Sequence, residues 1–185
     1  MPQKNKIHIM GASGSGTTSI AAQLCKAIGY QHFDTDDFYW HKTSPPYIAA
    51  RETQERQRLL SAQLTANNQW VLSGSLCGWG DLFIPFFDLV IYVYVKNDVR
   101  VERLRQREFA RYGEAIFSEG ELGEKYQTFI QWAAAYDTST EISRNAYKHR
   151  KWLENIGCPV VEITNHTTCD AAVERIITHI RHTAC

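Results

Sequence analysis

Residues 6–28 constrain the fold of this chain more than any other segment. A short, mostly apolar run, Lys6–Met10, is followed by the glycine-rich string Gly-Ala-Ser-Gly-Ser-Gly-Thr-Thr at positions 11–18. From Thr17 to Ile28, apolar residues recur at helical spacing, which predicts an amphipathic helix. A buried strand that passes through a glycine-rich turn into a helix predicts an α/β unit with the turn at the helix N-terminus.

The glycine-rich string matches the phosphate-binding pattern G-x-x-x-x-G-K-[ST] at every fixed position except the lysine. In that pattern the glycines let backbone N–H groups converge on phosphate oxygens, and the final hydroxyl helps to hold Mg²⁺. Thr17 stands at the lysine position, and Thr18 supplies the hydroxyl. The residues predicted to bind the phosphates of ATP are Gly11, Ala12, Ser13, Gly14, Ser15, Gly16, Thr17 and Thr18, of which Thr18 is also a predicted metal ligand.

Strand and helix patterns alternate along the rest of the chain. The near-continuous apolar run at 88–95 is typical of a strand buried on both faces of a parallel sheet. The predicted strands are 6–10, 30–33, 70–73, 88–95 and 159–163, and the predicted helices include 17–28, 49–65 and 99–111. This order predicts one three-layer α/β domain over residues 1–185 with a five-stranded parallel sheet.

Local signals add expectations for the second half of the chain. Asp98 has the character of an N-cap for the helix over 99–111. Residues 113–124 are rich in glycine and glutamate and are expected to form a loop. Thr138 and Glu141 have the spacing of a capping box, which predicts that a helix begins near them.

Composition excludes several classes of function. Twenty basic residues balance twenty acidic ones, so no overall charge favours nucleic acid or an anionic membrane. No apolar run approaches the roughly 20 residues of a membrane-spanning helix. The five cysteines form no C-x-x-C pair and favour reduced thiols, so we expect a cytoplasmic protein without membrane or nucleic-acid partners. The sequence does not indicate an oligomeric state.

The loop resembles that of the P-loop kinases of the adenylate kinase and shikimate kinase type. It is similar to the form G-A-P-G-S-G-K-G-T of adenylate kinases, with Ser13 in place of proline and Thr17 in place of lysine. The resemblance implies a three-layer P-loop NTPase fold with a helical lid, here residues 113–145. It also implies ATP as the phosphoryl donor and Mg²⁺ as the metal. It also implies that a small molecule or a nucleotide is the acceptor.

Acidic residues after the second predicted strand carry a further resemblance. The D-T-D spacing of Asp34 and Asp36 is similar to shikimate kinases, where such aspartates face the metal and the acceptor hydroxyl. The string D-D-F-Y from Asp36 resembles uridine and nicotinamide riboside kinases, where the first aspartate acts as the base. The resemblance implies that Asp36 is catalytic and that Asp34 contacts the metal and the acceptor. The competing interpretation is an aspartate-rich turn or helix cap.

Other resemblances place arginines and an acceptor loop near the same site. Arg103 and Arg107 match the R-L-x-x-R pattern at the start of the lid in adenylate kinase-like enzymes, which implies catalytic roles for both. The competing interpretation is a solvated helix face on which the arginines pair with Glu102 and Glu108. Residues 73–81 occupy the place of the glycine-rich acceptor loop of shikimate kinases, with Gly74 and Trp79 as acceptor contacts. Residues 165–167 correspond to a backbone contact with adenine. Two positions are open for Arg144 and His149: they reach the cleft from the far side of the lid or, as we favour, they lie at the surface.

These observations predict an ATP-dependent kinase that transfers the γ-phosphoryl group to a small acceptor. The substitution at Thr17 keeps an alternative open: a nucleotide-binding protein without transfer activity, because the missing ammonium normally lies against the β- and γ-phosphates. An RNA-binding protein is a third class, supported by the arginine-rich helix and opposed by the zero net charge. The aromatic residues Phe38, Tyr39, Trp40 and Trp79 suit an acceptor that contains a ring.

Overall fold

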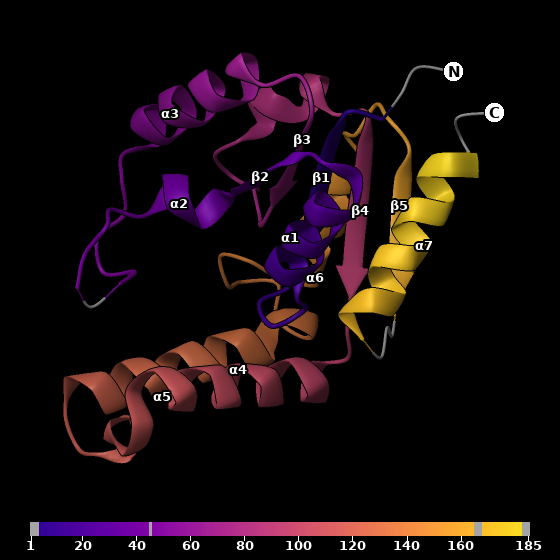
Figure 1. Ribbon diagram of the computed structural model, residues 1–185. Coiled ribbons are helices and arrows are strands. Elements are labelled where there is room, and N and C mark those ends of the chain that lie inside the picture. The colour runs from indigo at the N-terminus through magenta and orange to yellow at the C-terminus, as the bar shows by residue number, and fades with distance from the viewer. Residues whose placement is uncertain (1–3, 45, 165–167, 183–185) are drawn as a thin grey trace.

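The computed structural model describes residues 4–44, 46–164 and 168–182. Its centre is a five-stranded sheet in which every pair of neighbours is parallel, in the order β2-β3-β1-β4-β5 (Figure 1). The strands are β1 (Lys6–Gly11), β2 (Gln31–Asp34), β3 (Trp70–Ser73), β4 (Leu89–Tyr94) and β5 (Val160–Thr164). The predicted fold class, a three-layer P-loop NTPase fold with a five-stranded parallel sheet, is confirmed.

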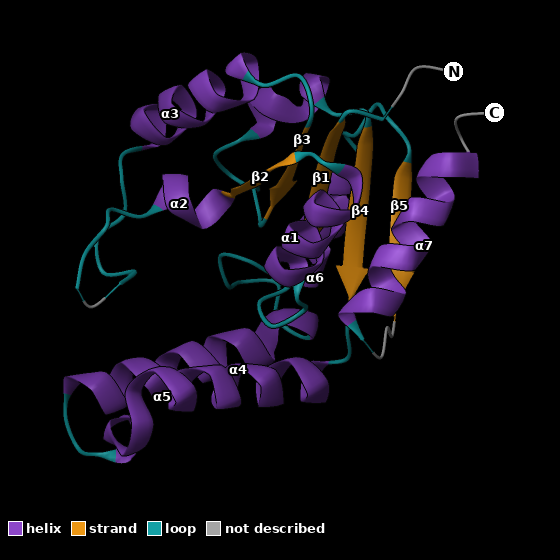
Figure 2. Ribbon diagram, viewed as in Figure 1, coloured by secondary structure: helices purple, strands orange, loops and turns teal. Residues whose placement is uncertain are grey.

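Seven α-helices and three short 3₁₀ segments connect the described strands (Figure 2). The α-helices are α1 (Thr17–Ile28), α2 (Thr35–Tyr39), α3 (Thr53–Ala66), α4 (Asn97–Tyr112), α5 (Glu121–Ala134), α6 (Ala146–Leu153) and α7 (Cys169–His182). The 3₁₀ segments are η1 (Asp81–Phe86), η2 (Gly113–Phe117) and η3 (Ala135–Asp137).

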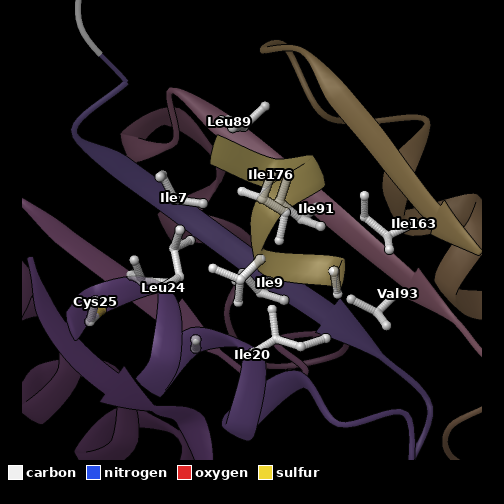
Figure 3. Packing of buried hydrophobic residues seen from close by; sticks show 14 of the residues in the cluster. Ile7, Ile9, Ile20, Leu24, Cys25, Leu89, Ile91, Val93, Ile163 and Ile176 are labelled. Carbon is white, nitrogen blue, oxygen red and sulfur yellow. The ribbon is translucent and has the colours of Figure 1, made fainter. Parts of the chain in front are cut away.

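The two faces of the sheet bury different sets of side chains because successive residues of a strand point to opposite faces. Ile7 and Ile9 of β1 are fully buried on the face that α1 and α7 cover, together with Leu24 and Ile176 (Figure 3). The opposite face buries Met10 against a cluster formed with α3, η1 and α6. This two-sided burial explains why β4, with five of its six residues buried, is a continuous run of apolar and aromatic residues.

A helical hairpin projects from the end of the sheet where the strands terminate. It consists of α4, which follows β4, and α5, which runs back alongside α4 (Figure 1). Val101 and Leu104 of α4 and Ile130 and Ala133 of α5 form a small apolar core of their own. The hairpin lies within and before the predicted lid, residues 113–145, and faces α2 across the carboxyl ends of the strands.

Three local expectations for this region are wrong. Asp98 lies in the first turn of α4, whose N-cap position is Lys96, and no side chain caps that helix. Residues 113–124 are not an open loop, because they contain η2 and the first turn of α5. Thr138 and Glu141 do not cap a helix: the next helix, α6, begins at Ala146 and is capped by the Asn145 side chain.

The structure also bears on the expected absence of membrane spans. None of the helices in the described part of the chain combines the length and apolar character that crossing a bilayer requires. Cys25, Cys77, Cys158 and Cys169, the four cysteines within the described ranges, are free thiols.

Candidate active site

The predicted phosphate loop wraps the N-terminus of α1 between β1 and the first turn of α4. Gly14 and Gly16 have φ angles of +82° and +89°, a backbone region that favours glycine. No side chain caps the helix at Gly16, so the first N–H groups of α1 have no side-chain acceptor there. The buried Ser15 hydroxyl oxygen has no hydrogen-bond partner in the described residues. Free N–H donors and an orphaned hydroxyl around one turn fit a bound phosphate.

The Thr18 hydroxyl lies beside the carboxylate of Asp34, the last residue of β2 and the N-cap of α2. Thr18 Oγ1 donates to Asp34 Oδ2 at 2.7 Å, and Ser73 Oγ donates to the same oxygen at 2.8 Å. The other carboxylate oxygen accepts from the backbone N–H of Asp36 at 3.0 Å. Hydroxyl and carboxylate oxygens are ligands that Mg²⁺ prefers, so this pair fits the predicted metal site next to the phosphate loop.

A cavity of about 600 Å³ lies between the phosphate loop and the helical hairpin. Its walls come from separate segments: Ser13 of the loop, Asp36 and Trp40 at α2, residues 46–48, Arg107, Glu108, Arg111 and Tyr112 of α4, Glu121, Leu122, Lys125, Tyr126, Phe129 and Trp132 of α5, and Arg144. The volume suits a small molecule or a nucleotide. Asp36 and the phosphate loop thus open into one space.

Asp36, the second residue of α2, lines this cavity. Burial by the surrounding protein raises the pKa of Asp36 above its ordinary value, and the nearby Asp34 carboxylate acts in the same direction. Arg144 and Arg107 oppose that shift by stabilising the charged form, so both guanidinium groups act on the Asp36 carboxylate. A carboxylate whose pKa is raised toward the operating pH is a better general base.

The structure places Arg103, Arg107 and Arg144 differently with respect to the cavity. Arg107 lines the cavity with a half-exposed side chain, which pairs with Glu108 at 2.8 Å and lies over the Phe129 ring. Arg103, one turn earlier on α4, does not line it. Arg144 lines the cavity over Trp132, so the surface position favoured from sequence is wrong.

Gly74 and Trp79, which are predicted acceptor contacts, are not among the residues that line the cavity. Gly74 has a φ of +105°, and a Cβ there would overlap the Thr35 hydroxyl, so its close approach is to the start of α2. Trp79 is 6% exposed, and its Nε1 donates to the Ser75 carbonyl at 3.1 Å. Among the four aromatic residues suggested for an acceptor ring, only Trp40 lines the cavity.

His149 is fully buried, so its expected surface position is also wrong. Its Nδ1 lies 2.8 Å from the Tyr136 hydroxyl, and its Nε2 lies 3.2 Å from the Ser75 hydroxyl. Burial lowers the pKa of His149 to about 3, with the Arg144 charge acting in the same direction. The imidazole is therefore neutral at physiological pH and joins α6 to the end of the hairpin and to the segment after β3.

Sequence reasoning also passed over Arg100, which is 1% exposed and donates to the Ser13 carbonyl of the phosphate loop at 3.2 Å. Its position was a signal, because Arg100, Leu104 and Glu108 recur every four residues along the buried stripe of α4. The stacked pair Phe129 and Trp132 on α5 had no comparable signal. The predicted adenine contact at 165–167 lies outside the described residues.

Comparisons with known proteins agree with this architecture. The family described as "AAA domain" matches residues 7–124 of the chain. The "Uncharacterized protein YqaC" of Bacillus subtilis (strain 168) is 40% identical over 177 residues, which cover 96% of this chain and 98% of YqaC. "Cytidylate kinase 2" of Borreliella afzelii (strain PKo) is 29% identical over 124 residues, which cover 61% of this chain and 68% of that protein.

A solved structure extends the likeness over almost the whole chain. "Shikimate kinase from Acinetobacter baumannii in complex with shikimate" superposes with a TM-score of 0.58 at 15% identity, covering 97% of this chain and 94% of the other. At that identity the comparison shows a shared fold. Together with the sequence relatives, it supports the resemblance to P-loop kinases that the glycine-rich loop indicates.

Proposed function

The chain belongs to the AAA domain family, and from that premise we propose that it is an ATP-dependent kinase for a small acceptor. The observation that carries the proposal is one cavity that joins a phosphate loop, a carboxylate and two arginines: Ser13, Asp36, Arg107 and Arg144 all line it. A phosphoryl donor, an acceptor hydroxyl and stabilising positive charge can therefore meet in one space.

The donor side consists of the loop Gly11–Thr18, whose N–H groups would hold the ATP phosphates. Thr18 and Asp34, joined at 2.7 Å, would hold Mg²⁺. Mg²⁺ held there would neutralise part of the negative charge of the phosphates. Ser73 fixes the Asp34 carboxylate from the sheet side, so its orientation does not depend on the ligand.

On the acceptor side, Asp36 would orient the attacking hydroxyl and accept its proton. The acceptor oxygen then forms a bond to the γ-phosphorus while the bond between that phosphorus and the β,γ-bridging oxygen breaks, leaving ADP. The raised pKa of Asp36, caused first by burial and then by Asp34, favours proton transfer to this carboxylate.

Arg107 and Arg144 would supply the positive charge that Thr17 cannot. Both act electrostatically on Asp36, and both lie over aromatic rings of α5, at 5.7 Å from Phe129 and 5.8 Å from Trp132. A guanidinium that stacks on a ring keeps in-plane N–H donors for anionic oxygens. Arg107 lies on α4 before the proposed lid and Arg144 lies near the end of the lid, so closure would bring their charge to the transferring group.

The alternative is a nucleotide-binding protein without transfer activity, and Thr17 is the observation that favours it. Loss of a single preorganised positive group can lower a rate by roughly 10²–10³-fold. In an idle binder the arginines would contribute to affinity alone.

Side-by-side assays of ATP consumption and ATP affinity separate the two functions. The wild type, Arg107→Ala and Thr17→Lys are compared across a panel of hydroxyl acceptors, with Arg105→Ala as the control on the exposed face of α4. A kinase loses more turnover than affinity in Arg107→Ala, because the guanidinium acts on transition-state charge. An inactive wild type whose Arg107→Ala variant changes ATP affinity alone would establish the idle binder.

A further inference from the structure

Arg100 of α4 is a charged residue at the centre of the molecule. Its side chain is 1% exposed, and its guanidinium lies 4.9 Å from the centre of the Tyr136 ring. Nε donates to the Val95 carbonyl at 3.0 Å, Nη1 donates to the carbonyls of Ser13 at 3.2 Å and Ala133 at 3.4 Å, and Nη2 donates to Asn97 Oδ1 at 3.2 Å and Asp137 Oδ2 at 2.7 Å. Five bonds match the five N–H donors of a guanidinium.

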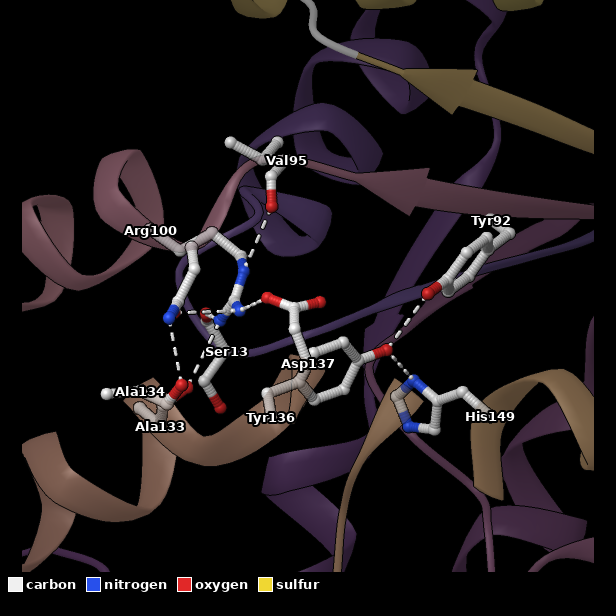
Figure 4. A network of polar contacts seen from close by, with 10 residues as sticks. Ser13, Tyr92, Val95, Arg100, Ala133, Ala134, Tyr136, Asp137 and His149 are labelled. Carbon is white, nitrogen blue, oxygen red and sulfur yellow. Dashed lines mark hydrogen bonds and ion pairs between the residues drawn. The ribbon is translucent and has the colours of Figure 1, made fainter. Parts of the chain in front are cut away.

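The partners of Arg100 belong to segments far apart in sequence (Figure 4). Ser13 is in the phosphate loop, Val95 follows β4, Asn97 begins α4, and Ala133 and Asp137 lie at the end of the α5–η3 segment. The single guanidinium therefore joins the phosphate loop to the base of the helical hairpin. Surface ion pairs contribute little to specificity, whereas a buried guanidinium with every donor satisfied holds its partners in one arrangement.

The contact with Ser13 determines which way one peptide group of the loop faces. In a trans peptide the carbonyl oxygen and the following N–H point in opposite directions. Because Arg100 draws the Ser13 carbonyl toward α4, the Gly14 N–H is directed away from α4. We infer that Arg100 is a positioning residue that presents the Gly14 N–H to a phosphate and joins the phosphate loop to the base of the hairpin.

Gly14 itself supports this orientation. Its φ is +82°, and a Cβ at this position would lie 2.6 Å from the Arg100 carbonyl oxygen and 3.1 Å from Leu104 Cγ. The loop backbone thus packs directly on α4, with no room for a side chain between them. The helix turn that carries Arg100 therefore also sets the distance between the Arg100 guanidinium and the phosphate loop.

This role has particular weight in a loop that contains Thr17. Without the usual lysine, attraction for phosphate comes from the N–H groups and the helix dipole, so the direction of each N–H matters more. The inference rests on the proposed function in this one respect, that the loop binds nucleotide phosphates.

The first test needs no ligand. In ¹³C,¹⁵N-labelled protein, the Ser13 carbonyl and Gly14 amide resonances are compared between the wild type and Arg100→Lys, which keeps the charge but has three donors. Arg105→Lys is the matched control, because Arg105 is exposed on the same helix and its ion pair, with Glu102 at 3.9 Å, lies on that helix. We expect the two loop resonances to move in Arg100→Lys and to stay unchanged in the control, while Ile28 at the far end of α1 keeps its signals.

Asp137→Asn serves as a second variant where Arg100→Lys does not fold. It weakens the hold on Nη2 while leaving Arg100 in place, so the same two resonances should move in the same direction by a smaller amount. Loop resonances that match the wild type in every folded variant would overturn the inference.

The second test measures affinity for inorganic pyrophosphate by titration calorimetry. Loss of one well-directed donor should weaken binding by roughly fivefold to tenfold in Arg100→Lys, and the Arg105→Lys control should stay within about twofold of the wild type. Equal affinity of the wild type and Arg100→Lys for pyrophosphate would overturn the inference about Arg100 and leave the proposed function intact. A wild type that binds neither pyrophosphate nor ADP would overturn the proposed function and, with it, the role of Arg100 in phosphate binding.

Discussion

Two buried histidines should make the stability of this protein fall as the pH drops below neutrality. His8 of β1 is fully buried, with Nδ1 3.0 Å from the Leu72 carbonyl and its ring stacked on Phe87 at 4.9 Å. Burial lowers the pKa of His8 to about 4, against a hydrogen bond to Leu72 that acts in the opposite direction. His149 is buried in the same way, and its pKa is lowered to about 3.

The sign follows from which state binds protons. Above a pH of about 6.5 both imidazoles are neutral in the folded and unfolded chains, so they add no pH dependence. Between 6.5 and the lowered values the unfolded chain takes up protons and the folded chain does not, so stability is lost as the pH falls. The loss for His8 levels off below a pH of about 4 and that for His149 below about 3.

The loss of stability at pH 5 depends mainly on the pKa of histidine in the unfolded chain, because the pKa values of both histidines in the folded chain lie below 5. One and a half pH units at ~1.36 kcal/mol per unit give about 2 kcal/mol for each histidine and about 4 kcal/mol for the pair. That is a large part of the free energy of unfolding of a typical domain, which is roughly 5–15 kcal/mol.

Urea unfolding at pH 8 and pH 5 measures this loss in wild type, His8→Phe and His149→Gln. Each variant should lose about 2 kcal/mol less than the wild type between the two pH values, whatever its stability at pH 8. His41→Asn, at an exposed histidine, should keep the wild-type dependence. Variants of His8 and His149 whose losses equal that of the wild type would refute the reasoning.

Three further predictions concern single side chains of the site and its supports. Asp36→Asn should lower kcat by roughly 10²–10⁴-fold while the calorimetric ATP affinity stays within about threefold, and a similar loss of affinity would contradict its role toward the acceptor. Asn145→Ala removes the fully buried cap of α6 and should lower the free energy of unfolding by about 1–3 kcal/mol in urea titrations; an unchanged midpoint would refute this. Gly74→Ala should destabilise the protein by clearly more than Gly78→Ala, which we expect to cost about 1–2 kcal/mol. Both glycines have positive φ angles, but only a Cβ at position 74 would meet Thr35. Equal losses in urea titrations would contradict the packing argument.

The sequence by itself determined the class of fold and the place of the phosphate loop. Helix α1 spans Thr17–Ile28 as predicted, and β4 lies within the predicted strand at 88–95. These elements were predictable because their signals are local: a glycine-rich turn between two apolar patterns, and a run of β-branched and aromatic residues long enough for a buried strand. The order of strands and helices then leaves few topologies besides a parallel sheet.

Boundaries in the hairpin region were less predictable. The glycines and glutamates of 113–124 favour a loop by composition, yet α5 begins at Glu121 because its apolar face packs on α4. Thr138 and Glu141 have capping-box spacing, but Asn145 caps the next helix instead. The Asn145 side chain donates to two carbonyls and accepts from the Lys148 N–H. Tertiary contacts outweigh helix propensities, because the propensities of most residues differ by less than roughly 1 kcal/mol.

Only the tertiary structure decided which charges meet at the cavity. Asp36, Arg107 and Arg144 are separated by more than a hundred residues in total, and neither helical spacing nor strand order specifies that they share one wall. Arg100 and Arg144 are the same kind of residue in sequence, yet one is sealed beneath the phosphate loop and the other opens into the cavity. The difference arises because burial and charge environment depend on which distant segments pack together, and periodicity within one segment carries no information about that choice.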